Sequence, residues 1–467
     1  MIPTKPLRKE RQQKYELLRK EYPFLTFRKI HYQITSGLLY VTFEFDLSGK
    51  ILFQPSFSIK SSLIDQISDN NYLQWLIFHI GIAELISYWK TTCPPVVRIE
   101  PYTLPSDAHK WWKNLYRFGL GEFFHTNGIE PDENFISFLF EGKASPPAHS
   151  AFNVSDMALV PIGGGKDSSV TLEILQHSEK NIKPFLLNPI KASIDTCLVA
   201  GFSVDELFII NRKLDPKMVE MNEQGFLNGH TPFSALLAFY SLLAAHITNR
   251  FDIVLSNESS ASEPTVPDTM INHQYSKSLA FETDFRNYTS RFIHPAYNYF
   301  SFLRPLNELQ IASLFATMPR YHPVFRSCNA GSKTGIWCGN CPKCLFTFII
   351  LSPFLASQTV ENIFNKSMLD APDLTLFLEQ LTGLASEKPF DCVGTIAEVT
   401  AAVQKLICSS NNGQLPALLR YYVTKVPVSD FEPALFQKLL TENNFNHHLD
   451  HTYLKILTDA LDKRPSK

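Results

Sequence analysis

The sequence predicts an α/β protein built on a parallel, doubly wound sheet with helices on both faces. Three observations support this fold class. From Asp156 onward, short apolar runs alternate with helical segments, which is the pattern of β-α-β crossovers. The preceding residues mix alternating runs with amphipathic stretches, and those after about Pro353 are mostly helical in pattern. We therefore expect an α+β domain before the sheet and a mostly helical region after it.

The composition is that of an ordinary globular protein. Apolar residues make up 45% of the 467 residues and charged residues 19%, which excludes disordered and collagen-like chains. Aromatic residues reach 13% whereas Gly is sparse at 19 residues, so we expect large, well-filled cores. The formal net charge of −2 provides no positive field for a polyanion, and we expect no nucleic-acid partner.

The sequence predicts neither a membrane span nor a secretory leader. No stretch reaches the roughly 18 uninterrupted apolar residues of a membrane helix. Gln74, His79 and Glu84 interrupt the longest candidate, Tyr72–Trp89. The N-terminus is rich in basic residues and lacks an apolar signal core, so we expect a cytoplasmic protein without a membrane partner. We interpret the basic run as a solvated helix face rather than a site for an anionic partner.

The α+β domain is predicted over residues 1–150. Strand-like alternation occurs at Leu38–Phe45 and Ile51–Ile59, and amphipathic stretches occur near Trp75–Trp89 and Trp111–Phe118. The segment Glu141–Ser155 contains consecutive prolines and small polar residues, which are typical of a linker. The predicted domains are therefore 1–150, 151–355 and 356–467.

The middle region supplies the predicted sheet and its crossover helices. The runs interpreted as strands are Ala158–Ile162, Pro184–Leu187, Leu207–Ile210 and Ile253–Leu255. The helical segments are Ser168–Gln176, Ile194–Ala200 and Pro232–Thr248. Ligands of such sheets bind at the carboxyl ends of the strands, so we expect the loops that follow these strands to carry the chemistry.

The loop after the first of these strands is Gly163-Gly164-Gly165-Lys166-Asp167-Ser168-Ser169, the glycine loop. Glycines allow backbone N–H groups to curl around an anion, and the following helix adds its positive N-terminal end, which predicts a phosphate cradle. The loop is not a Walker A motif, because Val160 and Asp167 occupy two of the required positions, nor is it G-x-G-x-x-G. A glycine turn capped by Asp167 is the alternative interpretation.

The glycine loop resembles the S-G-G-x-D-S loop of the N-type ATP pyrophosphatases, or PP-loop enzymes, with Gly163 in place of the leading Ser. In that superfamily the loop holds the pyrophosphate of ATP while a substrate oxygen attacks the α-phosphorus and forms an adenylate. The resemblance implies that the whole glycine loop binds ATP, with backbone donation from Gly164, Gly165 and Ser168. It also implies that Lys166 neutralises phosphate charge and that Asp167 organises Mg²⁺ or phosphate.

Four cysteines, Cys328, Cys338, Cys341 and Cys344, are spaced C-x9-C-x2-C-x2-C, whereas four others are scattered. In a cytosolic chain this cluster suits a structural Zn²⁺ better than disulfides, and a closed four-thiolate site leaves no open position for catalysis. An iron–sulfur cluster and a redox C-x-x-C pair are the alternatives. A pyrophosphatase loop followed by such a motif is similar to the arrangement in 7-cyano-7-deazaguanine synthase, a family of much shorter chains.

Further segments occur on both sides of the glycine loop. They are Glu84–Lys90, Cys93–Pro95, Gly119–Phe123, Gly229–Ser234, Leu255–Ser260, Asn272–Ser278, Arg304–Glu308 and Trp337–Cys344. Together they resemble UDP-N-acetyl-α-D-muramoyl-L-alanyl-L-glutamate epimerase, the MurL family. The resemblance extends from about residue 75 to residue 355, and its most specific parts are the glycine loop, the NHQYSKS segment and the four cysteines.

The resemblance implies an ATP-dependent isomerase of peptidoglycan precursor synthesis. Such an enzyme converts the terminal L-glutamate of UDP-N-acetylmuramoyl-L-alanyl-L-glutamate to D-glutamate, with ATP, Mg²⁺ and a structural Zn²⁺ as implied cofactors. A Cα proton beside a free carboxylate is hard to remove, because the enolate would carry two negative charges. Adenylation of the carboxylate acidifies this proton, so a base and an acid on opposite faces can invert the centre. Hydrolysis then releases the peptide and AMP.

The sequence leaves the acid and the base open. Candidates in predicted loops or turns are His230, Glu258, Glu263, His273, Tyr275 and Asp284. We assign catalytic roles to Lys166, Asp167, His230, Glu258 and His273, with Mg²⁺ binding at Asp167 and an alternative Mg²⁺ role for Glu258. Substrate binding is assigned to Tyr275, Arg286 and Arg304, since a guanidinium binds carboxylate or diphosphate bidentately. A surface ion pair is the alternative for each arginine.

Two other functions remain open at this point. One is another carboxylate-adenylating PP-loop enzyme, such as a nitrile or amide synthase or a tRNA-modifying enzyme. The other is a nonenzymatic nucleotide-binding regulator with a zinc motif. The near-neutral charge argues against tRNA, and ATP binding without turnover would favour the regulator.

Overall fold

The computed structural model of the chain describes residues 5–67, 69–144, 146–147, 157–266, 269–331, 334–410 and 415–463. Much of the predicted linker Glu141–Ser155 lies outside these residues, so the boundary near residue 150 stays a prediction. Among the described residues, no helix combines the length and the apolar character that crossing a bilayer requires.

The described strands form a single mixed sheet of eleven members. They are β1 (Phe24–Thr35), β2 (Leu38–Leu47), β3 (Ile51–Phe53), β4 (Ser56–Lys60), β5 (Val96–Ile99), β6 (Ser137–Phe140), β7 (Met157–Pro161), β8 (Asn181–Leu187), β9 (Phe208–Lys213), β10 (Asp252–Leu255) and β11 (Asn298–Ser301). Their order is β11-β10-β7-β8-β9-β4-β2-β1-β5-β6, with β3 paired to β2.

Helices precede, interrupt and follow the strands. Those of the first part are α1 (Lys5–Glu21), α2 (Asn70–Trp89), α3 (Ser106–Gly119) and α4 (Gly121–Thr126). Those of the middle part are α5 (Lys166–Gln176), α6 (Lys191–Val199), α7 (Pro216–Glu223), α8 (Phe233–Thr248), α9 (Leu279–Phe292), α10 (Glu308–Ala316) and α11 (Pro342–Leu351). The last part contains α12 (Ser357–Phe364), α13 (Thr375–Thr382), α14 (Ile396–Cys408), α15 (Ala417–Lys425), α16 (Pro433–Thr441) and α17 (His451–Asp462).

The expected α/β class is confirmed, and most of the expected elements are present. The strands β2, β7, β8, β9 and β10 overlap the five corresponding apolar runs, and α5, α6 and α8 overlap the expected crossover helices. The expected run Ile51–Ile59 is divided into β3 and β4, because Pro55 has no N–H for a ladder. The predicted strands did not include β1, β5, β6 or β11.

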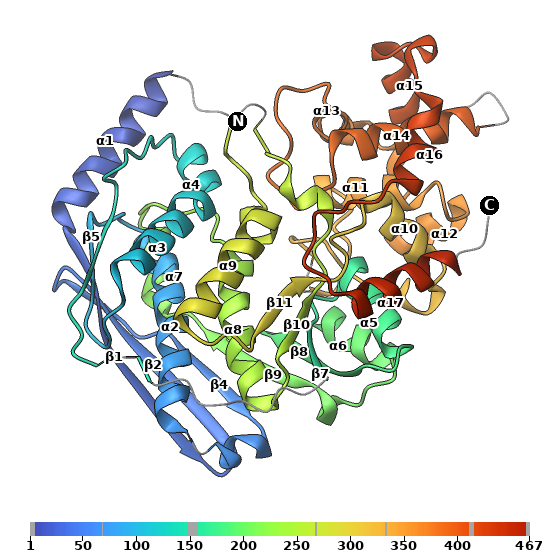
Figure 1. The fold of residues 1–467 in the computed structure, drawn as a ribbon. Helices are drawn as coiled ribbons and strands as arrows, with labels where there is room; N and C mark the ends of the chain where they lie inside the picture. Colours follow the sequence, from blue (N-terminus) through green and yellow to red (C-terminus); the bar gives the residue numbers. More distant parts are fainter. Residues whose placement is uncertain are drawn as a thin grey trace.

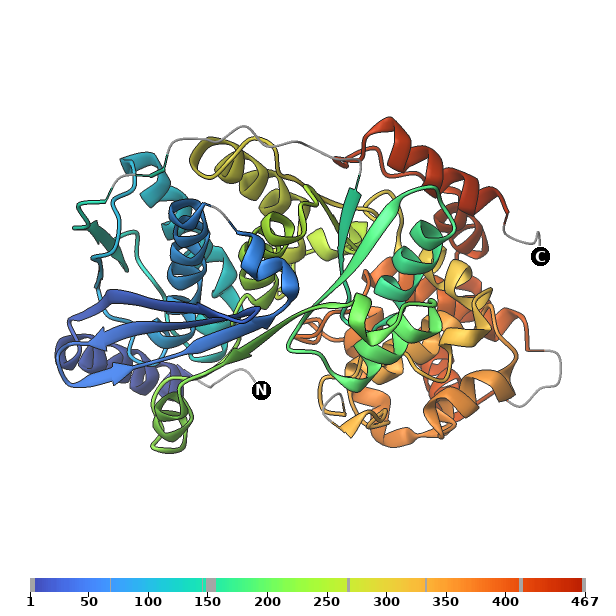
Figure 2. The ribbon, with the colours of Figure 1, turned by 90° about the horizontal axis from the view of Figure 1, so that it is seen from below.

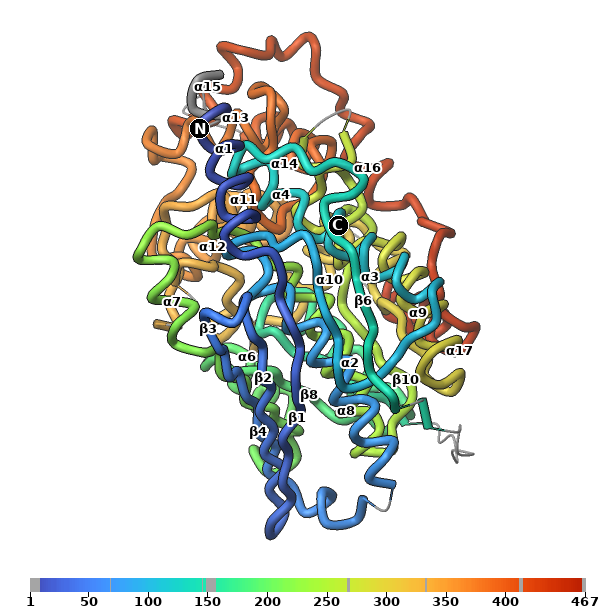
Figure 3. The backbone as a smooth tube through the Cα atoms, turned by 90° about the vertical axis from the view of Figure 1, so that its left-hand side faces the viewer, coloured from blue at the N-terminus to red at the C-terminus, as the bar shows by residue number. Residues whose placement is uncertain are grey.

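The first part of the sheet begins with a long hairpin. Thr35 pairs with Leu38, and the two residues between them, Ser36 and Gly37, both have positive φ angles. Two consecutive positive φ angles match the twist of a tight hairpin turn, which fixes the register of β1 against β2. Figure 3 shows β1, β2 and β4 running side by side.

Five parallel strands, β11-β10-β7-β8-β9, form the second part of the sheet. Their side chains alternate between two cores, as Leu159 packs with α8 and α9 whereas its neighbour Val160 packs with α5 and α10. Helices therefore cover both faces of these strands. Antiparallel pairing of β4 with β9 continues this part into the first, and Figure 2 shows the sheet extending across both parts of the molecule.

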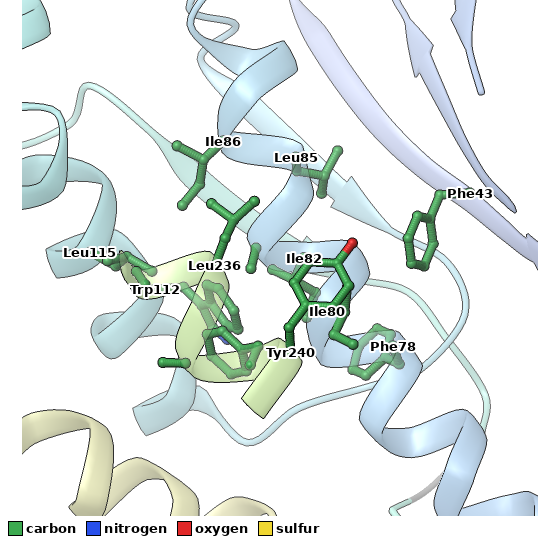
Figure 4. Packing of buried hydrophobic residues seen from close by; sticks show 14 of the residues in the cluster. Phe43, Phe78, Ile80, Ile82, Leu85, Ile86, Trp112, Leu115, Leu236 and Tyr240 are labelled. Carbon is green, nitrogen blue, oxygen red and sulfur yellow. The ribbon is translucent and has the colours of Figure 1, made fainter. Parts of the chain in front are cut away.

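The core of the first part is centred on α2, which is buried along nearly its whole length. Figure 4 shows its side chains between Phe43 of β2 on one side and Leu236 and Tyr240 of α8 on the other. A Cβ atom at Gly81 would lie 2.4 Å from the ring of Phe27, so the missing side chain lets α2 approach the sheet closely. The core thus joins residues before and after the predicted boundary.

The residues after 355 are mostly helical, as expected. In Figure 1 these helices, coloured orange to red, lie on the opposite side of the molecule from the blue N-terminal strands. The apolar side chains of α13 and α14 pack in the same core as those of α10 and α11. The loop 383–395 between α13 and α14 contributes Val393 to this core and brings Cys392 to the candidate site.

Candidate functional site

A cavity of about 370 Å³, the site cavity, lies where the order of the parallel strands reverses between β7 and β10. Ligands of open α/β sheets bind at such a reversal, beyond the carboxyl ends of the strands. The glycine loop after β7, Glu258 after β10 and Glu308 at the start of α10 all line the cavity. A larger cavity of about 890 Å³ between α5 and α17 contains none of the predicted site residues.

The glycine loop turns sharply between β7 and α5. Gly164 has a φ angle of +84°, and a Cβ atom there would lie 2.6 Å from the Ser193 nitrogen, so the loop packs against the start of α6. The N–H of Gly164 donates to Ser168 Oγ at 3.2 Å. At Gly163, by contrast, a Cβ atom would have no neighbour within 4 Å. Of the three glycines, it is Gly163 that leaves open space beside the cavity.

Lys166 and three acidic residues form the charged centre of the cavity. Its ammonium group contacts the carboxylates of Asp167 and Glu308, and the side chains of Lys166 and Glu308 are each 4% exposed. Burial lowers the pKa of Lys166, but the two carboxylates outweigh it and raise the pKa above its ordinary value. Lys166 therefore remains a cation inside the protein.

Asp167, Glu258 and Glu308 each offer a carboxylate oxygen, and the three oxygens lie within 4.8 Å of one another. Burial raises the pKa of Glu258 and of Glu308, and the neighbouring carboxylates raise both further. A divalent cation relieves such repulsion, and carboxylate oxygens are the ligands that Mg²⁺ prefers. The donor set thus fits Mg²⁺, and it includes Glu308, which the sequence analysis did not select. Its signal was its place at the end of the segment Arg304–Glu308.

The two predicted histidines lie together but behind the cavity wall. The rings of His230 and His273 are 4.5 Å apart, and both contact Glu122 of α4, with 3.3 Å between His230 Nδ1 and Glu122 Oε2. Burial and the neighbouring His273 lower the pKa of His230 to about 4. Burial also lowers the pKa of His273, but hydrogen bonds to Cys392 and Glu122 outweigh it and raise the pKa to about 9. At neutral pH the His230 ring is therefore neutral and the His273 ring is cationic.

The other predicted residues lie outside the cavity lining. Arg304 is fully buried, and its guanidinium donates to the carbonyl oxygens of Glu258 and Lys277 and, at 3.0 Å, to Glu282. Arg286 on α9 donates to the Tyr299 carbonyl at 2.7 Å.

The Tyr275 ring packs between Phe118 and Phe281. Glu263 pairs with Lys388, and Asp284 lies on α9. The substrate-binding roles of Tyr275, Arg286 and Arg304 stay predictions.

Four basic side chains line the cavity, namely Lys166, Lys277, Arg326 and Lys343. Of these four, only Lys166 was predicted from the sequence to be a functional residue. Lys277 lies in the NHQYSKS segment and Lys343 lies among the four cysteines, so both belong to segments that resemble the MurL family. Cys392, in the 383–395 loop, lines the same cavity and had no signal in the sequence, because it is distant from every motif. The cavity therefore combines a cationic lining with a compact acidic cluster.

The four cysteines converge as their spacing predicted. Their sulfur atoms lie within 4.8 Å of one another, with 3.9 Å between Cys328 and Cys341 and 3.7 Å between Cys338 and Cys344. A Zn–S bond of about 2.3 Å places tetrahedral sulfurs about 3.8 Å apart, whereas a disulfide requires about 2.05 Å. A hydrogen bond from Cys344 lowers the pKa of Cys341 to about 5. The cluster therefore fits a structural Zn²⁺.

This cysteine cluster supports one wall of the site cavity. Arg326, Ser327, Cys328 and Asn329 line the cavity on one side of the cluster, and Lys343 does so from within it. The Arg326 N–H donates to the Gly164 carbonyl at 2.8 Å, which attaches this wall to the glycine loop. A metal held by the four thiolates would therefore fix both cationic side chains of the wall.

The fold and site define an α/β protein with a glycine loop, a compact carboxylate cluster and a basic lining in one cavity. The chain belongs to the MurL family: residues 17–302 match the model of the MurL N-terminal domain, and residues 324–432 match that of the MurL C-terminal domain. The C-terminal match includes all four clustered cysteines and Cys392.

Curated relatives carry the name UDP-N-acetyl-alpha-D-muramoyl-L-alanyl-L-glutamate epimerase. The protein from Xanthomonas oryzae pv. oryzae is 35% identical over 69% of this chain and 72% of its own length. Those from a Micromonospora species and from Salinispora tropica are 31% and 32% identical, over 80% and 69% of this chain and 83% and 70% of their own lengths. No solved structure matches the chain.

Proposed function

We propose that this protein epimerises the terminal L-glutamate of UDP-N-acetylmuramoyl-L-alanyl-L-glutamate through an acyl-adenylate, with release of AMP and pyrophosphate. The names of the curated relatives support the epimerisation and its substrate. The observation that supports ATP chemistry is the convergence of the glycine loop, Lys166 and three carboxylates in one cavity beyond β7 and β10. On this basis we assign residues 151–355 to a doubly wound PP-loop domain, between regions 1–150 and 356–467.

The cavity has the charges that adenylation needs. The N-terminal end of α5 and the basic lining favour the phosphates of ATP, and Lys166 would neutralise the leaving pyrophosphate. Mg²⁺ would be held by Asp167, Glu258 and Glu308 and would offset phosphate charge. A carboxylate oxygen of the substrate then attacks the α-phosphorus, and the P–O bond to pyrophosphate breaks.

Adenylation also prepares the second half of the reaction. In the acyl-adenylate the carbonyl group beside Cα is neutral and bears an electron-withdrawing phosphate, so the enolate formed at Cα carries one negative charge instead of two and becomes accessible. One group removes the Cα proton, another returns a proton to the opposite face, and water then cleaves the anhydride. AMP leaves with the D-configured peptide.

The test is to incubate the pure protein with ATP, Mg²⁺ and the UDP-muramoyl dipeptide in D₂O and to measure AMP and deuterium at the glutamyl Cα. We expect AMP together with deuterium in a D-configured product. AMP without exchange would instead support another adenylating PP-loop enzyme. ATP binding without AMP would support the regulator.

Asp167→Asn should reduce AMP formation by about 100-fold, because a charged contact to the phosphates and Mg²⁺ is removed. Asp373→Asn is the matched control, since the Asp373 side chain is 60% exposed and lies outside the cavity. Unchanged AMP formation in Asp167→Asn would contradict the assignment of the glycine loop.

A further inference from the structure

The proposed inversion needs two proton-transfer groups at the substrate, and the cavity lining restricts the choice. Among the described lining residues, Asp167, Glu258 and Glu308 form the acidic cluster around Lys166, and Cys328 belongs to the four-cysteine cluster. The ammonium groups of lysine and the guanidinium of Arg326 offer no acceptor atom. The remaining titratable group with an acceptor atom is the thiol of Cys392, because His230 and His273 do not line the cavity.

Cys392 is held in place from both sides of the cavity. In the 383–395 loop, Asp391 accepts a hydrogen bond from Asn329 at 2.8 Å, and the Val393 carbonyl accepts one from Gln274 at 3.2 Å. Lys388, earlier in the loop, pairs with Glu263 and donates to the Gly394 carbonyl at 2.9 Å. Both neighbours of Cys392 are thus bonded to other segments, so its sulfur has a defined position.

Its surroundings stabilise a thiolate. The Lys277 ammonium donates to Cys392 Sγ at 3.2 Å, and His273, itself held by Glu122, forms a hydrogen bond with the same sulfur. The charged groups that face Cys392 are Lys277, Lys343, His273 and Asp391. Burial raises the pKa of Cys392, but Lys277, Lys343 and His273 outweigh it and hold the pKa well below its ordinary value.

We propose that Cys392 is one of the two groups that exchange the glutamyl Cα proton, with Lys277 and His273 as its positioning residues. This assignment rests on the proposed function and deepens it. As base, the thiolate forms an S–H bond while the Cα–H bond breaks, and the electron pair of that bond passes into the enolate of the acyl-adenylate. A second group then protonates Cα from the opposite face. In the reverse direction Cys392 donates the proton.

The arrangement gives two neighbours of Cys392 a role in the inversion. The pair of His273 and Glu122 lies beside Cys392 and stabilises its thiolate, and neither residue lines the cavity. Lys277 lines the cavity and contacts the sulfur, so it is placed to face the developing enolate oxygen as well as the thiolate. The 383–395 loop thereby gives the C-terminal region a direct part in the site.

The test compares the wild type, Cys392→Ser and the control Cys408→Ser, whose residue is exposed and distant from the cavity. Each is incubated in D₂O with ATP and, separately, with the L-glutamyl and the D-glutamyl substrate. Adenylation is followed by ATP–pyrophosphate exchange, which also shows that the variant is folded. In Cys392→Ser we expect inversion to fall by at least about 100-fold while adenylation is retained.

The two epimers give the decisive signature. If Cys392 serves one face only, its variant loses deuterium exchange from one epimer and keeps exchange, with retained configuration, from the other. Inversion at the wild-type rate, or equal exchange or equal loss for both epimers, would overturn the proposal. Failure of the wild type itself to invert the centre would instead overturn the proposed function.

A second variant tests the positioning role of His273. In His273→Gln the Cys392 thiolate loses a cationic neighbour, so the pKa of the Cys392 thiol rises. In a plot of inversion rate against pH, the acidic limb should therefore move to higher pH. A structural role alone would lower the rate at every pH without moving the limb. Mass spectrometry of quenched reactions adds one more outcome: a substrate–Cys392 thioester would show a nucleophile and would overturn the proton-transfer role.

Discussion

Lys166 is almost fully buried, and it keeps its charge because two carboxylates face its ammonium group. Burying a lysine costs free energy unless it is paired, and removing one partner of a buried pair is destabilising. The pair thus connects the glycine loop to Glu308 at the start of α10 before any ligand binds. Under the proposed function, a phosphate ligand with Mg²⁺ would take over these contacts.

His79 is a residue whose burial should appear in the pH dependence of stability. It is 1% exposed, and burial lowers its pKa to about 4, although a hydrogen bond to the Trp75 carbonyl opposes the shift. In the unfolded chain the pKa of His79 is near 6.5. Between pH 6.5 and pH 4 the unfolded chain therefore binds a proton at His79 that the folded chain does not bind. Stability present above pH 6.5 should be lost as the pH falls toward 4.

The variant His79→Phe should remove this contribution. The decrease in the free energy of unfolding between pH 7 and pH 4 should be about 3 kcal/mol smaller in His79→Phe than in the wild type. Urea unfolding at the two pH values measures the difference. The control Ile82→Val, in the same helix, should lose about 1 kcal/mol at both pH values. An identical pH dependence in His79→Phe and the wild type would contradict the prediction.

At the scale of elements, the sequence predicted what is local and missed what depends on distant partners. The crossover helices and the cysteine cluster each have a continuous pattern and were predicted correctly, and the glycine loop lies between β7 and α5 as expected. β5, β6 and β11 are only four residues long, and short runs carry little periodicity. Glu308 ends the segment Arg304–Glu308, but only the fold brings it to Asp167 and Glu258, and Cys392 lies far from every motif and has no local signature. His230 and His273 were predicted as site residues from their loops, whereas only the fold shows that they lie together and that His273 contacts Cys392.

Helix α2 should tolerate no side chain at Gly81. Ala favours helix by about 1 kcal/mol over Gly, but its Cβ atom would overlap the ring of buried Phe27, and overpacking a core costs about 1–3 kcal/mol. Gly81→Ala should therefore lower the free energy of unfolding by about 1 kcal/mol. In the double variant Gly81→Ala with Phe27→Leu, the smaller leucine side chain at position 27 should make room for the new Cβ atom at position 81. The double variant should therefore lose less free energy of unfolding than the sum of the losses of the two single variants. Additive costs would refute the close-approach argument.

The cysteine cluster should act on ATP binding through the cavity wall that it supports. Purified protein should contain one Zn²⁺ per chain and show no visible absorption band. Cys341→Ala should lose the metal and weaken ATP binding by about 10-fold or more, because Arg326 and Lys343 lose their support. Cys408→Ala should keep both properties, as its residue is exposed. Metal analysis and titration calorimetry measure these quantities, and full ATP affinity without metal would contradict the supporting role.

At the scale of the whole molecule, the continuous sheet connects the predicted α+β region to the parallel strands. β4 pairs with β9, and α2 packs against α8. Arg212 of β9 forms a bidentate ion pair with Glu84 of α2, at 2.5 and 2.6 Å, and the Glu84 side chain is 1% exposed. The division at residue 150 stays a prediction, but the contacts across it are those of a shared core.

A chain that begins at residue 151 should therefore fail to fold on its own. It would expose the apolar residues of α8 that pack on α2, and it would leave Arg212 without its carboxylate partner, which costs about 3–5 kcal/mol in a buried pair. We expect an insoluble or largely unfolded product by circular dichroism. In the full chain, the first region and the parallel strands should unfold together in urea, because one core spans both. A soluble chain of residues 151–467 that binds ATP would show instead that the parallel strands and their helices need no support from the first region.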